Sequence, residues 1–225
     1  MAAADRLDLP AVGERQSLRE QVAQALRAAL IAGEMRPGVV YSAPVLAAQF
    51  GVSATPVREA MLDLAKEGLV EAVRNKGFRV TELSDRDLDE LTELRRLIEV
   101  PTVARLAGTM EAAAFERLRP IAEEIVVAGE AGDLLAYVDA DLRFHVELLA
   151  LSGNARLVSV VRDLRNRARL YGLSQLSERD ALGDSAREHL ALLDALAGGD
   201  GEAVARLMDE HIGHVRGIWA AHAGS

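Results

Sequence analysis

The stretch Phe50-Gly51-Val52-Ser53-Ala54-Thr55-Pro56-Val57-Arg58-Glu59-Ala60-Met61 decides how the first third of this chain folds. Gly51 is typical of a tight turn that ends a helix, because glycine adopts left-handed backbone angles without steric cost. Ser53 and Thr55 are hydroxyl residues of the kind that begin a helix, and Pro56 is tolerated only in a helix's first turn. The stretch therefore predicts a helix, a turn and a second helix, the arrangement of a helix-turn-helix.

The sequence on both sides extends this motif into a winged helix. Apolar periodicity and turn composition predict three helices and two strands, over 17–32, 43–50, 54–67, 69–73 and 78–81. The link Arg74-Asn75-Lys76-Gly77 has the composition of a hairpin turn. We therefore expect a winged helix-turn-helix domain over residues 17–81, preceded by a flexible arm over residues 1–16.

The rest of the chain is helical by pattern. Apolar residues recur at helical spacing, with glycines between the periodic segments, and predict helices near 84–107, 111–129, 133–151, 155–172, 178–197 and 200–222. The expected fold class is mainly α: an N-terminal winged helix-turn-helix and a C-terminal all-α bundle of six or seven helices over residues 84–222.

Composition limits where the chain works and what it binds. Cysteine is absent, no apolar run is long enough to span a bilayer, and Met1 to Pro10 lacks the apolar core of a secretory signal. We therefore expect a cytoplasmic protein with no membrane partner. The net charge of −9 is uneven: residues 1–80 have a net charge of +1 and residues 81–225 one of −10. A nearly neutral first part supports nucleic-acid binding only weakly, so local geometry must supply the positive field.

The start of the third helix and the hairpin carry the candidate DNA contacts. Ser53, Thr55 and Arg58 lie where a recognition helix presents donors to the major groove. Lys76 and Arg79 on the hairpin are placed to reach phosphates or the minor groove. The alternative is that a hydroxyl caps the helix and the arginine is merely solvated.

The segment FGVSATPVREAMLDLAKEGLVEAVRNKGFRV, within residues 17–81, resembles the winged-helix reader of GntR-type bacterial transcription regulators. The resemblance implies that Ser53, Thr55, Arg58 and the wing tip Asn75-Lys76-Gly77 touch double-stranded operator DNA. Two residues depart from the family's pattern: Ala54 replaces a usual arginine, and Ala43 replaces a common acidic residue. The first change removes one phosphate or guanine partner, so the operator sequence is not predicted.

Four residues of the helical part are of metal-ligand types: Asp141, His145, His189 and His211. Each lies on an apolar face of its predicted helix, and Asp141 and His145 are four residues apart, which places their side chains next to each other. A buried carboxylate needs a partner, and a cation held by three imidazoles and one carboxylate would supply it. The alternative for each histidine is an ordinary hydrogen-bonded core residue.

Arg95 interrupts an apolar stripe on the first helix after the wing. An inward arginine binds a carboxylate or phosphate at two points. Its partner is either a ligand or an internal acid such as Glu99 or Asp141.

The order Glu93-Leu94-Arg95, Glu99, Asp141-Leu142-Arg143-Phe144-His145, His189 and His211 resembles the FCD effector domain of FadR-subfamily GntR regulators. The resemblance implies a divalent metal on Asp141, His145, His189 and His211, and a small organic acid bound with the help of Arg95. Three nitrogens and one oxygen suit zinc first, and nickel, manganese or iron as well.

These features together predict a transcription regulator, a repressor by preference and not an enzyme, that binds its operator as a homodimer and responds to a small carboxylate. A metal-dependent enzyme acting on small organic acids is the alternative, because a site with open coordination positions can activate water. An architectural DNA-binding protein without a ligand would leave the helical part without a task.

Overall fold

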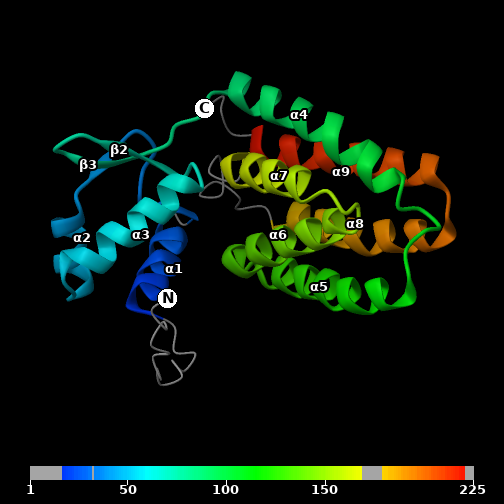
Figure 1. The fold of residues 1–225 in the computed structure, drawn as a ribbon, viewed down its shortest axis with the longest axis horizontal. Coiled ribbons are helices and arrows are strands. Elements are labelled where there is room, and N and C mark those ends of the chain that lie inside the picture. The colour runs from blue at the N-terminus through cyan, green and yellow to red at the C-terminus, as the bar shows by residue number, and fades with distance from the viewer. Residues whose placement is uncertain (1–16, 32, 169–178, 221–225) are drawn as a thin grey trace, which may run out of the picture.

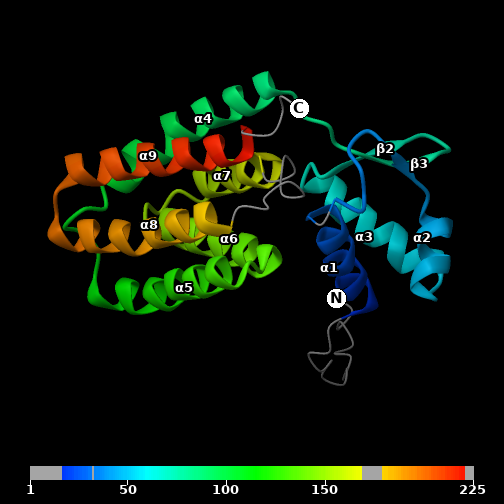
Figure 2. The same cartoon turned by 180° about the vertical axis from the view of Figure 1, so that it is seen from behind.

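The computed structural model describes residues 17–31, 33–168 and 179–220 and shows a small N-terminal head beside a larger helical bundle (Figures 1 and 2). The head has the elements α1 (Leu18–Ile31), β1 (Val40–Tyr41), α2 (Ala43–Phe50), α3 (Ala54–Lys66), β2 (Val70–Val73) and β3 (Gly77–Val80). All the helices and strands expected in this part are present, with ends that differ by at most one residue. The arm expected over residues 1–16 lies outside the described residues.

Strand β1 was not predicted. It is two residues long and exists because it pairs with β3, Val40 opposite Arg79 and Tyr41 opposite Phe78. Strand β3 lies between β1 and β2, and both pairings are antiparallel. Such a short strand has no periodicity of its own, and only the tertiary pairing defines it.

The turn between α2 and α3 follows the sequence closely. The hydroxyl of Ser42 accepts a hydrogen bond from the Val45 amide and caps α2. Gly51 ends α2 in the left-handed conformation, at φ 67°, and its N–H donates to the Ala47 carbonyl. The apolar faces of the three helices and the sheet then form one core, with Val57, Ala60, Met61 and Leu64 fully buried in it.

The bundle comprises α4 (Asp85–Ala104), α5 (Ala112–Ala131), α6 (Leu134–Ala150), α7 (Ala155–Ala168), α8 (Arg179–Gly198) and α9 (Gly201–Ala220). Helix α4 begins with a capping box, in which Ser84 and Asp87 satisfy each other's backbone amides. The six predicted helices are confirmed, although the ends expected at 172 and 222 and the start expected at 178 lie outside the described residues.

The bundle has its own apolar core, separate from that of the head. Helix α5 packs on α6 and α8, and α4 packs on α9 (Figure 1). At Gly129 the α5 backbone approaches α8 closely, since an added Cβ would lie 3.2 Å from the Ala186 Cβ and 3.3 Å from the Leu182 carbonyl oxygen. This close approach fixes the part of α8 that carries His189.

Among the described helices, none combines the length and the apolarity that crossing a bilayer requires.

Gly77 provides a test of how the wing is held. A Cβ at Gly77, at φ 136°, would lie 2.3 Å from the Tyr41 carbonyl oxygen, whereas one at Gly51 would meet no described atom within 4 Å. We expect Gly51→Ala to cost about 1–2 kcal/mol of backbone strain. Gly77→Ala adds a backbone clash to its strain and should cost more than about 2 kcal/mol. Thermal unfolding followed by circular dichroism measures both, and equal losses would contradict the close packing of β3 on β1.

Candidate functional site

The N-terminal end of α3 is exposed and its hydroxyls are not used in capping. Ser53 is the N-cap residue, but its side chain makes no capping hydrogen bond. Ser53, Thr55 and Arg58 are all exposed, while the opposite face of α3 is buried in the head core. The capping role considered for Ser53 is therefore not what the structure shows, and its hydroxyl is available to a partner.

The wing presents the polar side chains of Arg74, Asn75 and Lys76 at its tip. Asn75 adopts a positive φ of 59°, and the Lys76 amide donates to the Val73 carbonyl at 3.0 Å, which closes the turn. Asn75 and Lys76 are exposed and Gly77 is half-buried. Arg79 is also exposed but lies away from the tip, in β3, opposite Glu71 on β2.

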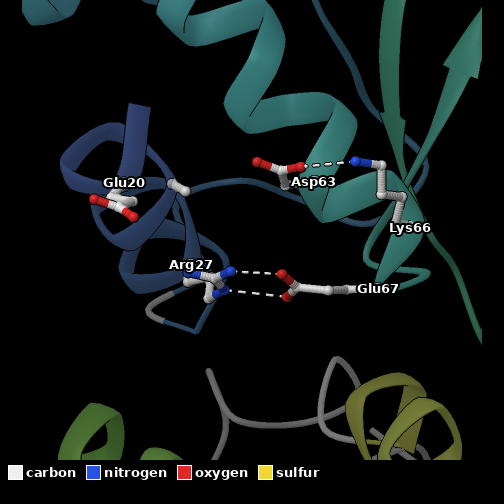
Figure 3. Close-up of a pocket in the computed structure, with 6 residues that line it drawn as sticks. Glu20, Arg27, Asp63, Lys66 and Glu67 are labelled. Carbon is white, nitrogen blue, oxygen red and sulfur yellow. Dashed lines mark hydrogen bonds and ion pairs between the residues drawn. The ribbon is translucent and has the colours of Figure 1, made fainter. Parts of the chain in front are cut away.

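Ion pairs attach α1 to the other end of α3. Arg27 on α1 pairs with Glu67 just after α3, and Lys66 pairs with Asp63, around a groove between the two helices (Figure 3). Arg19 on α1 also reaches Asp63, at 2.5 Å. All these contacts lie at the C-terminal end of α3. Its N-terminal end, with Ser53, Thr55 and Arg58, takes no part in these ion pairs.

The structure brings the four predicted metal ligands together inside the bundle. Helix α6 supplies Asp141 and His145, α8 supplies His189 and α9 supplies His211, and one ligand atom of each lies within 4.8 Å of all the others. The three imidazole Nε2 atoms are neighbours: that of His145 lies 3.1 Å from that of His189 and 3.2 Å from that of His211. All four side chains are buried, Asp141 with 7% of its surface exposed and the histidines with 3% or less.

In His189 and His211, the hydrogen bond made by Nδ1 determines whether Nε2 carries a lone pair. The Nδ1 of His189 donates to the Ala186 carbonyl at 3.1 Å, and that of His211 donates to the Glu188 carboxylate at 2.7 Å. In a neutral ring each Nε2 is then an acceptor. Burial lowers the pKa of His211 to about 4 and, with the nearby Arg165 guanidinium, lowers the pKa of His145 well below its ordinary value. The rings of His145 and His211 are therefore neutral at pH 7.

The hydrogen bonds of this cluster leave one of its ring nitrogens without a partner in the described structure. The His189 Nε2 lies 3.2 Å from the Asp141 Oδ1, so a carboxylate oxygen adjoins the ring nitrogens. The His145 ring holds a single proton, and its Nδ1 is buried without a hydrogen-bond partner in the described structure. The three converging Nε2 atoms and the Asp141 carboxylate oxygen are of the types that coordinate a divalent cation such as zinc. The residues present therefore fit the metal that the sequence predicts.

Glu188 is a contributor that the sequence did not reveal. Its carboxylate accepts from the buried His211 and from the exposed His214. Carboxylates in this position fix the tautomer and the ring orientation of metal-binding histidines. Glu188 directly precedes His189 and faces another helix, so only the packing of α8 on α9 brings it to His211.

A second set of buried charges adjoins the cluster. Arg165 on α7 donates to Glu99 on α4 and, at 3.3 Å, to the Asp141 Oδ2. Arg95 donates to the Glu99 Oε1 at 2.8 Å, which confirms the internal ion pair considered for it. The Arg95 Nη2 is buried and has no hydrogen-bond partner in the described structure. It is therefore a donor available to a further acceptor.

The guanidinium groups of Arg95 and Arg165 keep the carboxylate of Glu99 ionised. Burial raises the pKa of Glu99, but the guanidinium groups of Arg165 and Arg95 outweigh it and hold that pKa below its ordinary value. Burial also lowers the pKa of Arg165 to about 10, with Arg95 contributing, so Arg165 still carries its charge at pH 7. Sequence reasoning missed Arg165, because α7 is rich in arginine and nothing in its pattern distinguishes this one.

Comparison with known proteins identifies both parts of the chain. Residues 18–80 match the model of the gntR family of bacterial regulatory proteins, and residues 90–214 match the FCD domain. The chain belongs to the GntR family. Its N-terminal winged helix-turn-helix is the family's DNA-binding module and its helical bundle is an FCD domain, as the two resemblances implied.

Relatives agree with this assignment over most of their length. The chain is 30% identical over 198 residues, 88% of its length and 87% of the relative's, to the "Probable D-xylose utilization operon transcriptional repressor" of Paenarthrobacter nicotinovorans. It is 26% identical to the transcriptional repressor RspR of Escherichia coli over 88% of the chain and 86% of RspR. The solved structure of E. coli McbR/YncC superposes with a TM-score of 0.74 at 27% identity, covering 92% of this chain and 99% of that one.

The hydrogen bond from His211 to Glu188 provides a test of the metal centre. We expect Glu188→Ala to weaken zinc binding by about 10- to 100-fold, because His211 loses the partner that orients its ring. Glu188→Gln keeps an acceptor and should retain more of the affinity. Isothermal titration of metal-free protein with zinc measures both variants.

Glu147→Gln, an exposed position on α6, is the matched control and should bind zinc like the unmodified protein. Unchanged affinity in Glu188→Ala would contradict the role of this carboxylate.

Proposed function

We propose that this GntR-family regulator is a repressor whose winged head, within residues 17–81, binds a palindromic operator as a homodimer. Two-fold symmetry of the protein would match two half-sites on the DNA. Ser53, Thr55 and Arg58 would contact base edges and phosphates in the major groove, and Asn75, Lys76, Gly77 and Arg79 would contact the backbone from the wing. The exposed, uncapped start of α3 supports this assignment.

The FCD domain, within residues 84–222, is proposed to hold a divalent metal, zinc by preference, on Asp141, His145, His189 and His211. When bound, the ion supplies a Lewis-acidic centre with positions open to an anionic ligand. The observation that carries this proposal is that four buried residues each offer one potential ligand atom, all within 4.8 Å of one another.

A small organic acid is the proposed effector. The chain Arg95–Glu99–Arg165–Asp141 connects the cluster to an arginine with one unused buried donor, the Nη2 of Arg95. A carboxylate would satisfy that donor, and arginine is the side chain best suited to bind one at two points. The effector then changes operator affinity by no more than the difference between its affinities for the two states of the protein. The relatives carry the names of regulators, so a regulatory role is proposed for the site and not catalysis.

The division of labour between head and bundle can be tested at Arg58. We expect Arg58→Ala to abolish a gel shift with the DNA upstream of the chain's own gene at low salt, because a major-groove donor is lost. Its zinc affinity should be unchanged. Arg117→Ala, an exposed arginine on α5, is the control and should bind the DNA normally. Failure of the unmodified dimer to shift this DNA would contradict the proposal.

The role of Arg95 can be tested without removing its charge. Arg95→Lys should preserve an ion pair with Glu99 but lose the forked donor pair, which we expect to weaken acid binding by at least about tenfold. Mass spectrometry of the purified protein identifies the co-purified acid, and its titration into both proteins measures the affinities. Equal affinities would exclude Arg95 from the effector site.

A further inference from the structure

The recognition helix, the wing and the connection to the bundle meet at one residue, Gly68. Gly68 follows α3 with φ 76°, and its amide donates to the Ala65 carbonyl at 3.1 Å. Its carbonyl accepts from the Thr81 hydroxyl at 2.7 Å, just beyond β3. Leu69 donates to the Leu64 carbonyl in α3 and accepts from the Thr81 amide. A displacement of Gly68 therefore moves α3 and the base of the wing together.

A side chain of the FCD domain lies against this junction. A Cβ added to Gly68 would be 3.0 Å from the Nε of Arg167 and 3.1 Å from its Cγ. Arg167 is in the last turn of α7, and in both views the end of α7 lies beside the head (Figures 1 and 2). Arg167 thus contacts the place where the elements of the reading head are joined.

The same turn of α7 also reaches the candidate metal centre. Arg165, two residues before Arg167, is 3% exposed and donates to Asp141 and Glu99. Residues two apart on an α-helix project to nearly opposite sides, because each residue turns the helix by about 100°. One turn of α7 therefore directs one arginine into the bundle and the other onto the head.

Occupancy of the cluster changes the forces on Arg165. The carboxylate of Asp141 faces the histidines with Oδ1 and accepts from Arg165 with Oδ2. A cation held by the cluster shares this carboxylate with Arg165 and repels its guanidinium at short range in a buried setting. An anion bound to the neighbouring Arg95 would act in the opposite sense, because it would attract the Arg165 guanidinium. Either change alters the preferred position of the last turn of α7.

We propose that Arg167 is the coupling residue through which the state of the Asp141 cluster reaches the recognition helix. The inference rests on the proposed function of the cluster as a metal and effector site. Arg167 touches neither the metal centre nor the exposed start of α3. Its loss should therefore leave both binding activities intact and remove only their interdependence, which for coupled sites typically amounts to about 5- to 150-fold in affinity.

The experiment is hydrogen exchange of the full chain with and without zinc, for the unmodified protein, Arg167→Ala and Arg162→Ala. Arg162 is an exposed arginine of the same helix that lines a depression with Ala150 of α6. We expect zinc to slow exchange around His189 and His211 in all three proteins. At residues 64–70 zinc should change the exchange rate by at least about twofold in the unmodified protein and in Arg162→Ala, but not in Arg167→Ala.

Three results would overturn the inference. The first is that zinc leaves the exchange rate at residues 64–70 unchanged in the unmodified protein. The others are that zinc changes this rate equally in Arg167→Ala, or that Arg162→Ala loses the effect of zinc as well. A gel shift on the same samples separates this outcome from the proposed function. If zinc changes the junction but not operator affinity, the coupling contact stands and the proposed function fails. If zinc does not slow exchange at the histidines, the metal site fails and the inference fails with it.

Discussion

The carboxylate of Asp141 is the group on which the arrangement of the FCD domain depends. An ionised carboxylate in a protein interior is costly unless positive charge surrounds it. Here Arg165 supplies that charge on the Oδ2 side, while the Oδ1 side faces the imidazoles of His145 and His189. One buried anion thus connects α6 to α7 and α8, and a second, Glu99, connects α7 to α4.

Under the proposed function, these buried charges lie on a route between the FCD domain and the DNA-binding head, although the two parts keep separate apolar cores. The apolar clusters of the two parts have no residue in common. Between them the Arg167 side chain lies against Gly68, and the charge of Asp139 adds a little to the raised pKa of Arg27, which its hydrogen bond to Glu67 mainly causes. Such interactions rearrange at lower cost than a shared apolar core, which would suit the proposed regulation, in which the head changes position.

The sequence predicted much of this because its signals are local. Gly51 ends α2 and Ser84 begins α4 as their residue types dictate, and the i, i+4 spacing placed Asp141 beside His145 on a buried face. His189 and His211 approach that pair only through the tertiary packing of the helices. The sequence indicated this only by residue types on apolar faces and by a family resemblance. Strand β1, Glu188 and Arg165 were missed, because each owes its role to a partner far away in sequence. A two-residue strand is too short to show a periodic pattern. Nothing in the sequence of α7 distinguishes the buried Arg165 from the other arginines of that helix.

The most direct test of the account is X-ray absorption spectroscopy of the purified chain after a stoichiometric metal measurement. The account predicts one divalent ion per chain, with a first coordination shell of three imidazole nitrogens and at least one oxygen, and loss of that ion in His189→Ala. A metal-free protein that does not take up zinc, or an ion whose surroundings are unchanged in His189→Ala, would contradict it.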